Sequence, residues 1–174
     1  VIDAATDQII SRVAVGKRPH MTVLSAAGKV YTTGTGTNDV TVVDAATLRV
    51  ERKIPVQANG PEHAALSPDG QFLWVANVAG NAVSVIDLAA AKTVQVLKGL
   101  SQPHNIVFAP DGKAYVTQVG SYRVAVFTPG QATPVARIAA GSPARLASLH
   151  PQKVQGVNNA ALAQGLLFAT NQDA

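Results

Sequence analysis

The sequence predicts an all-β fold in which one unit of four short strands is repeated along the chain. The residues that mark the unit recur every 42 residues: Pro19, Pro61 and Pro103, and likewise Gly28, Gly70 and Gly112. Between the markers lie short runs rich in β-branched and aromatic residues, separated by turn residues and with hardly any helical periodicity. A fixed period of this length is typical of stacked units that cannot bury their apolar faces alone.

Each unit can be divided into its strands in chain order. The first apolar run ends at a Pro-Asp-Gly turn, at 68–70 and 110–112, and at a weaker Ala-Ala-Gly turn at 26–28. The second strands are read at 31–33, 73–77 and 115–118, and the third at 40–44, 83–87 and 124–128. More polar outer strands follow at 8–15, 48–56, 93–98 and 134–139. One extra residue lies between Gly70 and Trp74.

Four-stranded antiparallel units without helices predict a β-propeller, a radial array of sheets called blades. Period arithmetic gives one segment, 1–174, of about four blades, with repeats at 1–44, 45–87, 88–128 and 129–174. Because the chain starts and stops within a unit, we expect a piece of a larger ring of seven or eight blades. The alternative is that 168–174 and 1–15 complete one shared blade, within a four-bladed ring or between two self-associating chains.

The chain resembles the YVTN β-propeller repeat family. The sequences YVTQ at 115–118 and WVAN at 74–77 stand at the motif that names the family, with SPDG at 67–70 and VID at 85–87 as companions. The resemblance covers about residues 1–149 and returns at 168–171. It implies an extracytoplasmic, periplasmic location, in a family that includes binding proteins, cofactor carriers and lactonase-like enzymes.

Composition excludes several classes of function. The net charge of +4 comes from 14 basic and 10 acidic residues scattered through the repeats, and aromatic content is 5%. A nucleic-acid surface needs a basic stripe with interleaved aromatic side chains, so we expect no nucleic-acid partner. Without cysteine the chain has no disulfides and no thiolate metal site, and no apolar run is long enough to span a bilayer.

The residues that follow the repeated proline are the strongest site candidates. His20 and His104 occupy one equivalent place, and Glu62, with His63 beside it, occupies that place in the second unit. The fourth unit has Arg145 near its Pro143. Because this place begins the innermost strand of a blade, we expect these side chains to meet at one mouth of the central channel.

Imidazoles and a carboxylate suit a transition metal such as zinc or copper, so His20, Glu62, His63 and His104 are predicted as metal ligands. Because packed sheets lie about 10 Å apart, side chains from neighbouring blades must reach far inward to bind one ion at bond lengths of about 2 Å. A wide tetrapyrrole would bridge the blades more easily. A purely local role is also open, in which the histidines only satisfy backbone groups. Two further functions fit the pattern: a lactonase-like hydrolase, in which the histidines position water, and a purely structural or protein-interaction propeller.

The loops between second and third strands should lie at the same end as the histidines. In the third of these loops we predict Tyr122 and Arg123 as ligand contacts, together with Arg145. Glycines 34 and 36 are interpreted as turn residues and Trp74 as a filler between blades. The insertion 152–165 is expected to replace a first-to-second strand turn and to contain one or two helical turns at 157–163. The sequence thus predicts a non-catalytic binding or scaffold propeller that holds a metal ion or a cofactor-like ligand at the channel mouth.

Overall fold

The computed structural model describes residues 1–140, 157–163 and 166–171. Three complete four-stranded antiparallel sheets form its body. The first sheet contains β3 (Pro19–Leu24), β4 (Lys29–Gly34), β5 (Asp39–Asp44) and β6 (Arg49–Pro55). The second contains β7 (Pro61–Leu66), β8 (Phe72–Asn77), β9 (Ala82–Asp87) and β10 (Lys92–Leu97), and the third β11 (Pro103–Phe108), β12 (Ala114–Gln118), β13 (Arg123–Phe127) and β14 (Ala136–Ala139). The all-β propeller prediction is confirmed.

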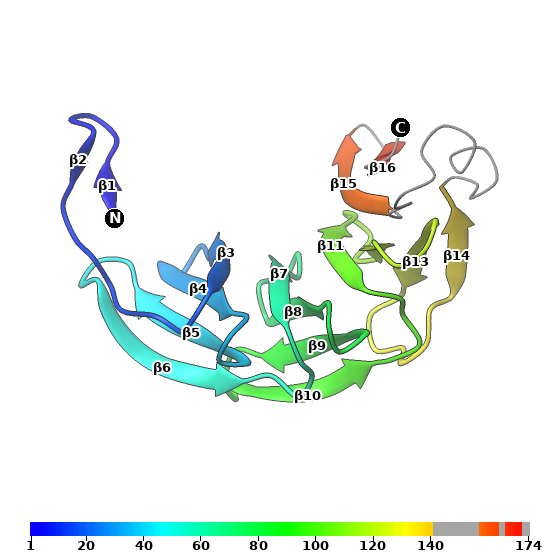
Figure 1. Ribbon diagram of the computed structural model, residues 1–174, viewed down its shortest axis with the longest axis horizontal. Coiled ribbons are helices and arrows are strands. Elements are labelled where there is room, and N and C mark those ends of the chain that lie inside the picture. Colours follow the sequence, from blue (N-terminus) through cyan, green and yellow to red (C-terminus); the bar gives the residue numbers. More distant parts are fainter. Residues whose placement is uncertain (141–156, 164–165, 172–174) are drawn as a thin grey trace.

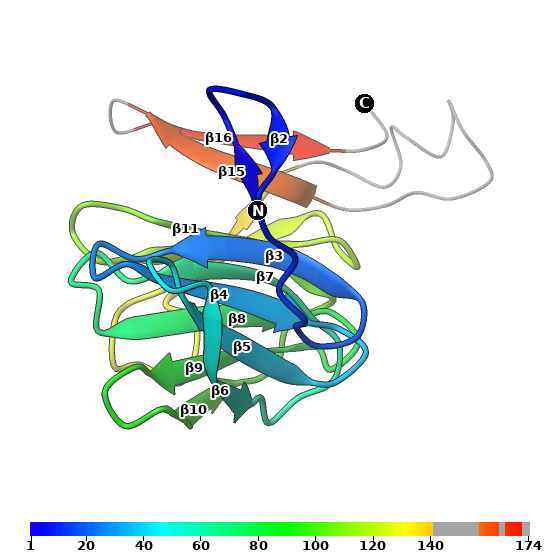
Figure 2. The same cartoon turned by 90° about the vertical axis from the view of Figure 1, so that its left-hand side faces the viewer.

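The three sheets stand side by side in an open arc (Figure 1). Their first strands, β3, β7 and β11, are neighbours on the concave side, and the fourth strands lie on the convex side (Figures 1 and 2). The predicted repeats 45–87 and 88–128 each begin with the outer strand of one sheet and end in the third strand of the next. The unit 45–87, for example, contains β6 of the first sheet and β7 to β9 of the second.

Two short sheets lie at the ends of the arc. Strands β1 (Ile2–Asp3) and β2 (Gln8–Ile9) form one, and β15 (Val157–Ala163) and β16 (Leu166–Asn171) form the other. They belong to separate sheets at opposite ends of the arc, so the described residues show no closure of one chain into a four-bladed ring (Figure 1).

The helical turns predicted for 157–163 are wrong, because this segment is strand β15. It contacts β11 and pairs with β16, and it therefore occupies the place of a first strand in a fourth sheet. The sequence Val-Asn-Asn-Ala-Ala-Leu-Ala has no strong preference of its own, and pairing with β16 decides its conformation. The rest of the predicted insertion, 152–156 and 164–165, lies outside the described residues.

The core is divided between the two sheet junctions. Successive side chains of a strand point to opposite faces, so in β8 Leu73 and Val75 pack against the first sheet while Trp74 and Ala76 pack against the third. All four are buried. The second sheet is thus covered on both faces, which explains why its inner strands β8 and β9 read as nearly continuous apolar runs.

The turns reproduce the details that the spacing predicts. Gly70 and Gly112 have φ of 69° and 83°, a conformation that glycine adopts without a steric penalty. The turn after β7 is closed by a hydrogen bond from the Ser67 amide to the Phe72 carbonyl, one residue longer than the equivalent Ala109–Lys113 bond. This longer turn accommodates the extra residue before Trp74.

No helix among the described residues is long and apolar enough to cross a membrane.

Candidate functional site

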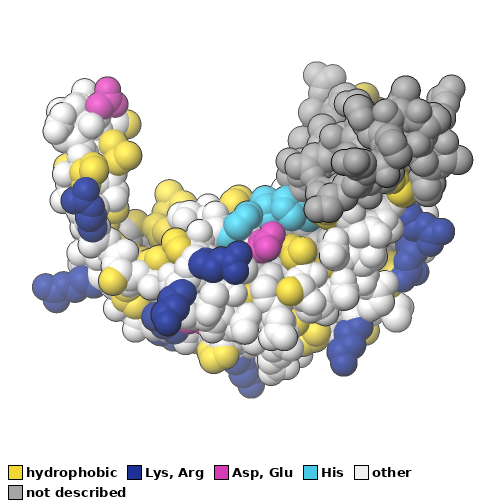
Figure 3. All heavy atoms as spheres, in the orientation of Figure 1, with side chains coloured by type: hydrophobic (Ala, Val, Ile, Leu, Met, Phe, Trp, Pro, Cys, Tyr) yellow, Lys and Arg dark blue, Asp and Glu magenta, His cyan; other side chains and the backbone are white. Residues whose placement is uncertain are grey.

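Histidines from all three sheets meet on the concave side of the arc (Figure 3). His20 comes from β3, His63 from β7 and His104 from β11. Their ring centroids are 5.1 Å apart for His20 and His63, 3.9 Å for His63 and His104, and 6.5 Å for His20 and His104. The prediction that residues far apart in the chain would share one opening is met for these three, and with Glu62 they are here called the histidine cluster.

A repeated irregularity of the first strand places these side chains. In each sheet the register between the first and second strands shifts directly after the repeated proline, at 19–22, 61–64 and 103–106. Such bulges twist a strand and redirect its side chains, and they are common beside functional sites. The two residues inside each bulge are His20 and Met21, Glu62 and His63, and His104 and Asn105.

Threonines of the second strands support the bulges. The Thr33 hydroxyl accepts from the Met21 amide and donates to the Glu62 carbonyl at 2.7 Å, which ties the first sheet to the second at the site. Thr117 accepts in the same way from the Asn105 amide. The sequence reasoning missed these positioning residues, although a threonine at the same place in the first and third units was a visible signal.

Glu62 provides the negative charge of the cluster. Its Oε2 lies 3.9 Å from Nε2 of both His20 and His104, too far for a hydrogen bond but close enough to attract either ring once it is protonated. The side chain of His20 is 43% exposed and that of His104 is 16% exposed. His20 is therefore the more accessible of these two imidazoles.

His63 is held in its neutral form. Burial, reinforced by the neighbouring His104 and His20, lowers the pKa of His63 to about 4. Its Nδ1 is buried and has no hydrogen-bond partner among the described residues, and the same holds for Oδ1 of Asn105 in the equivalent place of β11. For His63, this disagrees with the view that the histidines only satisfy backbone groups.

The imidazoles do not form a preformed metal centre. No group of three or more His, Asp or Glu side chains in the described part of the chain has an arrangement that could hold a metal ion. The ring planes of the histidines are tilted by 49° to 84° against one another. The metal-ligand assignment of His20, Glu62, His63 and His104 stays a prediction, and it would require the side chains to turn.

The remaining predicted ligand contacts are farther from the cluster or outside the description. The second-to-third strand loops do lie at the histidine end, because Pro103 pairs with Gln118 and Gln118 with Arg123. Tyr122 and Arg123 stand at the start of the third strand, two strand spacings or about 10 Å from β11. Arg145 lies outside the described residues.

The glycines of the first such loop serve close packing. The Gly36 amide donates to the Lys17 carbonyl, and a Cβ on Gly36 would come within 3.1 Å of that oxygen. Gly34 pairs with Pro19 at the end of β4. The interpretation of both as turn residues, in place of a phosphate cradle, agrees with these contacts.

The family model of the YNCE-like β-propeller matches residues 10–127. The chain belongs to this family. The match covers the first two complete sheets and most of the third, and it agrees with the resemblance to YVTN repeats. A search of curated proteins found no match to this member.

Solved structures of other proteins are similar to this family member. Hydrazine synthase of Kuenenia stuttgartiensis is 29% identical, with a TM-score of 0.66 over 76% of this chain and 39% of that one. A functionally unknown protein of Desulfotomaculum acetoxidans is 20% identical, with a TM-score of 0.63 over 73% of this chain and 43% of that one.

The dihydro-heme d1 dehydrogenase NirN, solved in complex with DHE, is 14% identical, with a TM-score of 0.66 over 79% of this chain and 32% of the other. At this identity the likeness shows the fold alone. The chain spans less than half the length of each of the three solved chains.

Proposed function

We propose that this propeller is a non-catalytic binding protein whose histidine cluster receives a flat, cofactor-like ligand of the tetrapyrrole class. The observation that supports it most is the meeting of three imidazoles from three sheets on the open, concave side of the arc. Imidazole faces and edges offer stacking surfaces, and a neutral imidazole nitrogen offers a ligand to a metal.

The geometry favours a ligand that brings most of its own metal coordination. A protein zinc site needs three or four side-chain ligands at about 2 Å, which the described side chains do not supply as they stand. A tetrapyrrole iron needs only one or two axial protein ligands. His20 is the accessible candidate for that role, while His63 and His104 would form the wall behind it.

The residues of the cluster fit such a ligand in their charge as well. His63 stays neutral at physiological pH, so it can face an apolar ring without an added desolvation cost. The Glu62 carboxylate lies 3.9 Å from Nε2 of His20 and of His104, so its negative charge would offset the positive charge of a bound iron. When bound, a tetrapyrrole would supply light absorption and, with iron, electron exchange; the chain itself binds and orients it.

Titration with hemin tests this proposal. We expect the wild-type protein to shift the Soret band to a position typical of imidazole ligation, His20→Ala to lose that shift, and His104→Ala to weaken binding. Arg49→Ala, on the exposed outer strand β6, is the control. Hemin binding that is unchanged in a His20→Ala/His63→Ala/His104→Ala variant would refute the proposal.

The competing functions give different outcomes in parallel assays. Stoichiometric zinc or copper binding that depends on all three histidines would support a simple metal site. Lactone hydrolysis that is lost in Glu62→Gln would support the hydrolase. If no ligand binds in any assay but the protein still binds a partner protein, the purely structural or protein-interaction role is supported.

We further propose an extracytoplasmic, periplasmic location, supported by the family resemblance. Cell fractionation after expression of the full-length protein tests this location: the protein should be found in the periplasmic fraction.

A further inference from the structure

A cleft of about 650 Å³ lies between the second and third sheets, at the end of the inner strands opposite to the histidine cluster. It is bordered by the turns after β7, β11 and β13 and by the outer strand β10. This volume is in the range of pockets for small organic molecules. The side chains that matter here are Asp69, Phe72, Trp74, Val94, Phe108 and Asp111, and the feature is called the turn cleft below.

The interior of the turn cleft is aromatic. Trp74 meets Phe108 edge to face with ring centroids 5.3 Å apart, and it meets Phe127 at 6.0 Å. Trp74 is buried, whereas Phe72 and Phe108 are only partly buried and line the cleft. Partly buried rings of this kind gain free energy when an apolar group covers them.

The border of the turn cleft is acidic. Asp69 and Asp111 line it, and no lysine or arginine is among its described lining residues. Asp69 accepts hydrogen bonds from the Ser67 hydroxyl and the Gln71 amide, which lower its pKa and keep it ionised. Asp111 is paired with Lys113, which is not among the lining residues, at 2.6 Å, so its charge is partly compensated.

Comparison with the first sheet shows what is particular to this place. The fourth strands of the first and second sheets, β6 and β10, each contain a register shift at the same position. The extra residue at this shift is Glu51 in β6 and Val94 in β10. Glu51 is engaged by Lys29, whereas Val94 is 46% exposed and borders the cleft. The second sheet thus presents an apolar side chain to solvent where its neighbour has a salt bridge.

From these observations we propose that the turn cleft is a second binding site, for a small organic cation that carries an amine on an aromatic body. The aromatic body would cover Phe72 and Phe108, and the amine would face Asp69 and Asp111. This proposal does not depend on a ligand at the histidine cluster, which lies at the opposite end of the strands.

The test uses Trp74, the one tryptophan of the chain, as a fluorescent reporter inside the site. Phenethylamine, phenethyl alcohol and 3-phenylpropionate are probes with the same aromatic body and a positive, neutral or negative head. We expect the amine to change the Trp74 emission at the lowest concentration and 3-phenylpropionate at the highest, because the acidic border attracts a positive head and repels a negative one.

Charge variants at an exposed position make the test specific. Val94→Lys should weaken amine binding at least tenfold and Val94→Glu should strengthen it several-fold, with the opposite order for 3-phenylpropionate. Asp69→Asn should weaken amine binding and Lys113→Gln should strengthen it. Val50→Lys, on the exposed strand β6, is the control for folding and overall charge.

Three outcomes would overturn the proposal: no change in Trp74 emission with any probe, equal affinity for all three probes, or an order that Val94→Lys and Val94→Glu leave unchanged. A loss of amine binding in the His20→Ala variant would also contradict it, because the two sites are separate. If hemin binding fails while the amine order holds, only the proposed function is lost.

Discussion

The imidazole rings of His63 and His104 lie 3.9 Å apart across the junction of the second and third sheets. Both residues stand in the bulges that follow the repeated prolines. Two like groups this close cannot both accept a proton without repulsion, and this repulsion adds to burial in lowering the pKa of His63.

The first prediction concerns acid stability. Because the pKa of His63 is about 4 in the folded protein and near 6.5 in the unfolded chain, the unfolded state binds more protons between these values. The stability that His63 contributes is therefore present above about pH 6.5 and is lost as the pH falls towards 4. After allowance for its partial exposure we expect a loss on the order of 1–2 kcal/mol.

Urea unfolding at pH 7 and pH 4.5 measures this effect. In His63→Gln the free energy of unfolding should differ less between the two pH values than in the wild type. NMR of the wild type should show the His63 ring titrating near pH 4. A normal midpoint near 6.5 would contradict the burial argument.

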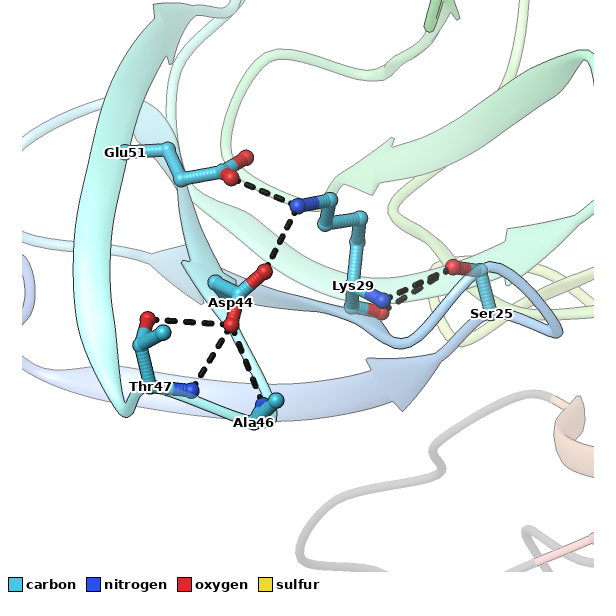
Figure 4. Close-up of polar contacts among 6 residues, drawn as sticks. All are labelled: Ser25, Lys29, Asp44, Ala46, Thr47 and Glu51. Carbon is cyan, nitrogen blue, oxygen red and sulfur yellow. Dashed lines mark hydrogen bonds and ion pairs between the residues drawn. The ribbon is translucent and has the colours of Figure 1, made fainter.

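The second prediction concerns the turn after β5 (Figure 4). Asp44 binds Lys29 at 2.8 Å through Oδ2, and its Oδ1 accepts from the Ala46 and Thr47 amides and the Thr47 hydroxyl. Lys29 also reaches Glu51 at 2.5 Å. These contacts hold the pKa of Asp44 far below its usual value, with the Lys29 hydrogen bond as the largest cause.

We expect Lys29→Gln to raise the pKa of Asp44 only in part, because the three turn hydrogen bonds remain. Asp44→Ala should destabilise the protein more than Lys29→Gln, because it removes the turn bonds as well. High salt should reduce the loss in free energy of unfolding that Lys29→Gln causes, because salt screens the attraction between exposed charges. Carboxylate NMR titration and urea unfolding measure these changes, and equal losses for the two variants would contradict the turn argument.

The third prediction concerns the junction of the second and third sheets. Phe127 is fully buried and lies against Trp74 with ring centroids 6.0 Å apart. Phe127→Ala should lower the free energy of unfolding by about 3–5 kcal/mol through lost burial and a remaining cavity. Val135→Ala, at a position 56% exposed, should change it by less than about 0.5 kcal/mol. Urea denaturation of both variants tests this, and similar losses would refute the assigned core.

The fourth prediction concerns a link between sheets. Asn81 has φ of 51°, and its Oδ1 accepts from the Gln102 amide at 2.8 Å, as Asn38 accepts from Gly60. Asn81→Ala loses the acceptor and leaves alanine in a left-handed conformation, so we expect a loss of about 1–2 kcal/mol. Asn81→Asp keeps a side-chain oxygen as acceptor and tolerates the left-handed conformation, so it should retain most of the stability that Asn81→Ala loses. Thermal unfolding would show the difference, and equal melting temperatures for both variants would speak against the link.

The amino-acid sequence is sufficient to predict the repeat, the strand order within each unit and the end of the sheets at which the histidines lie. Local chemistry decides these features: proline and glycine fix the turns, and nearly continuous apolar runs mark the strands that are buried on both faces. Even the extra residue before Trp74 is visible in the spacing, and it appears as the longer turn from Ser67 to Phe72.

Three properties of the site depend on the folded chain: how close His20, His63 and His104 come, how their rings tilt, and that His63 is kept neutral. They arise from bulges and from packing between sheets, which link residues about forty positions apart in the chain. The prediction for 157–163 is wrong for the same reason, because pairing with β16 and contact with β11, and not local preference, make this segment a strand.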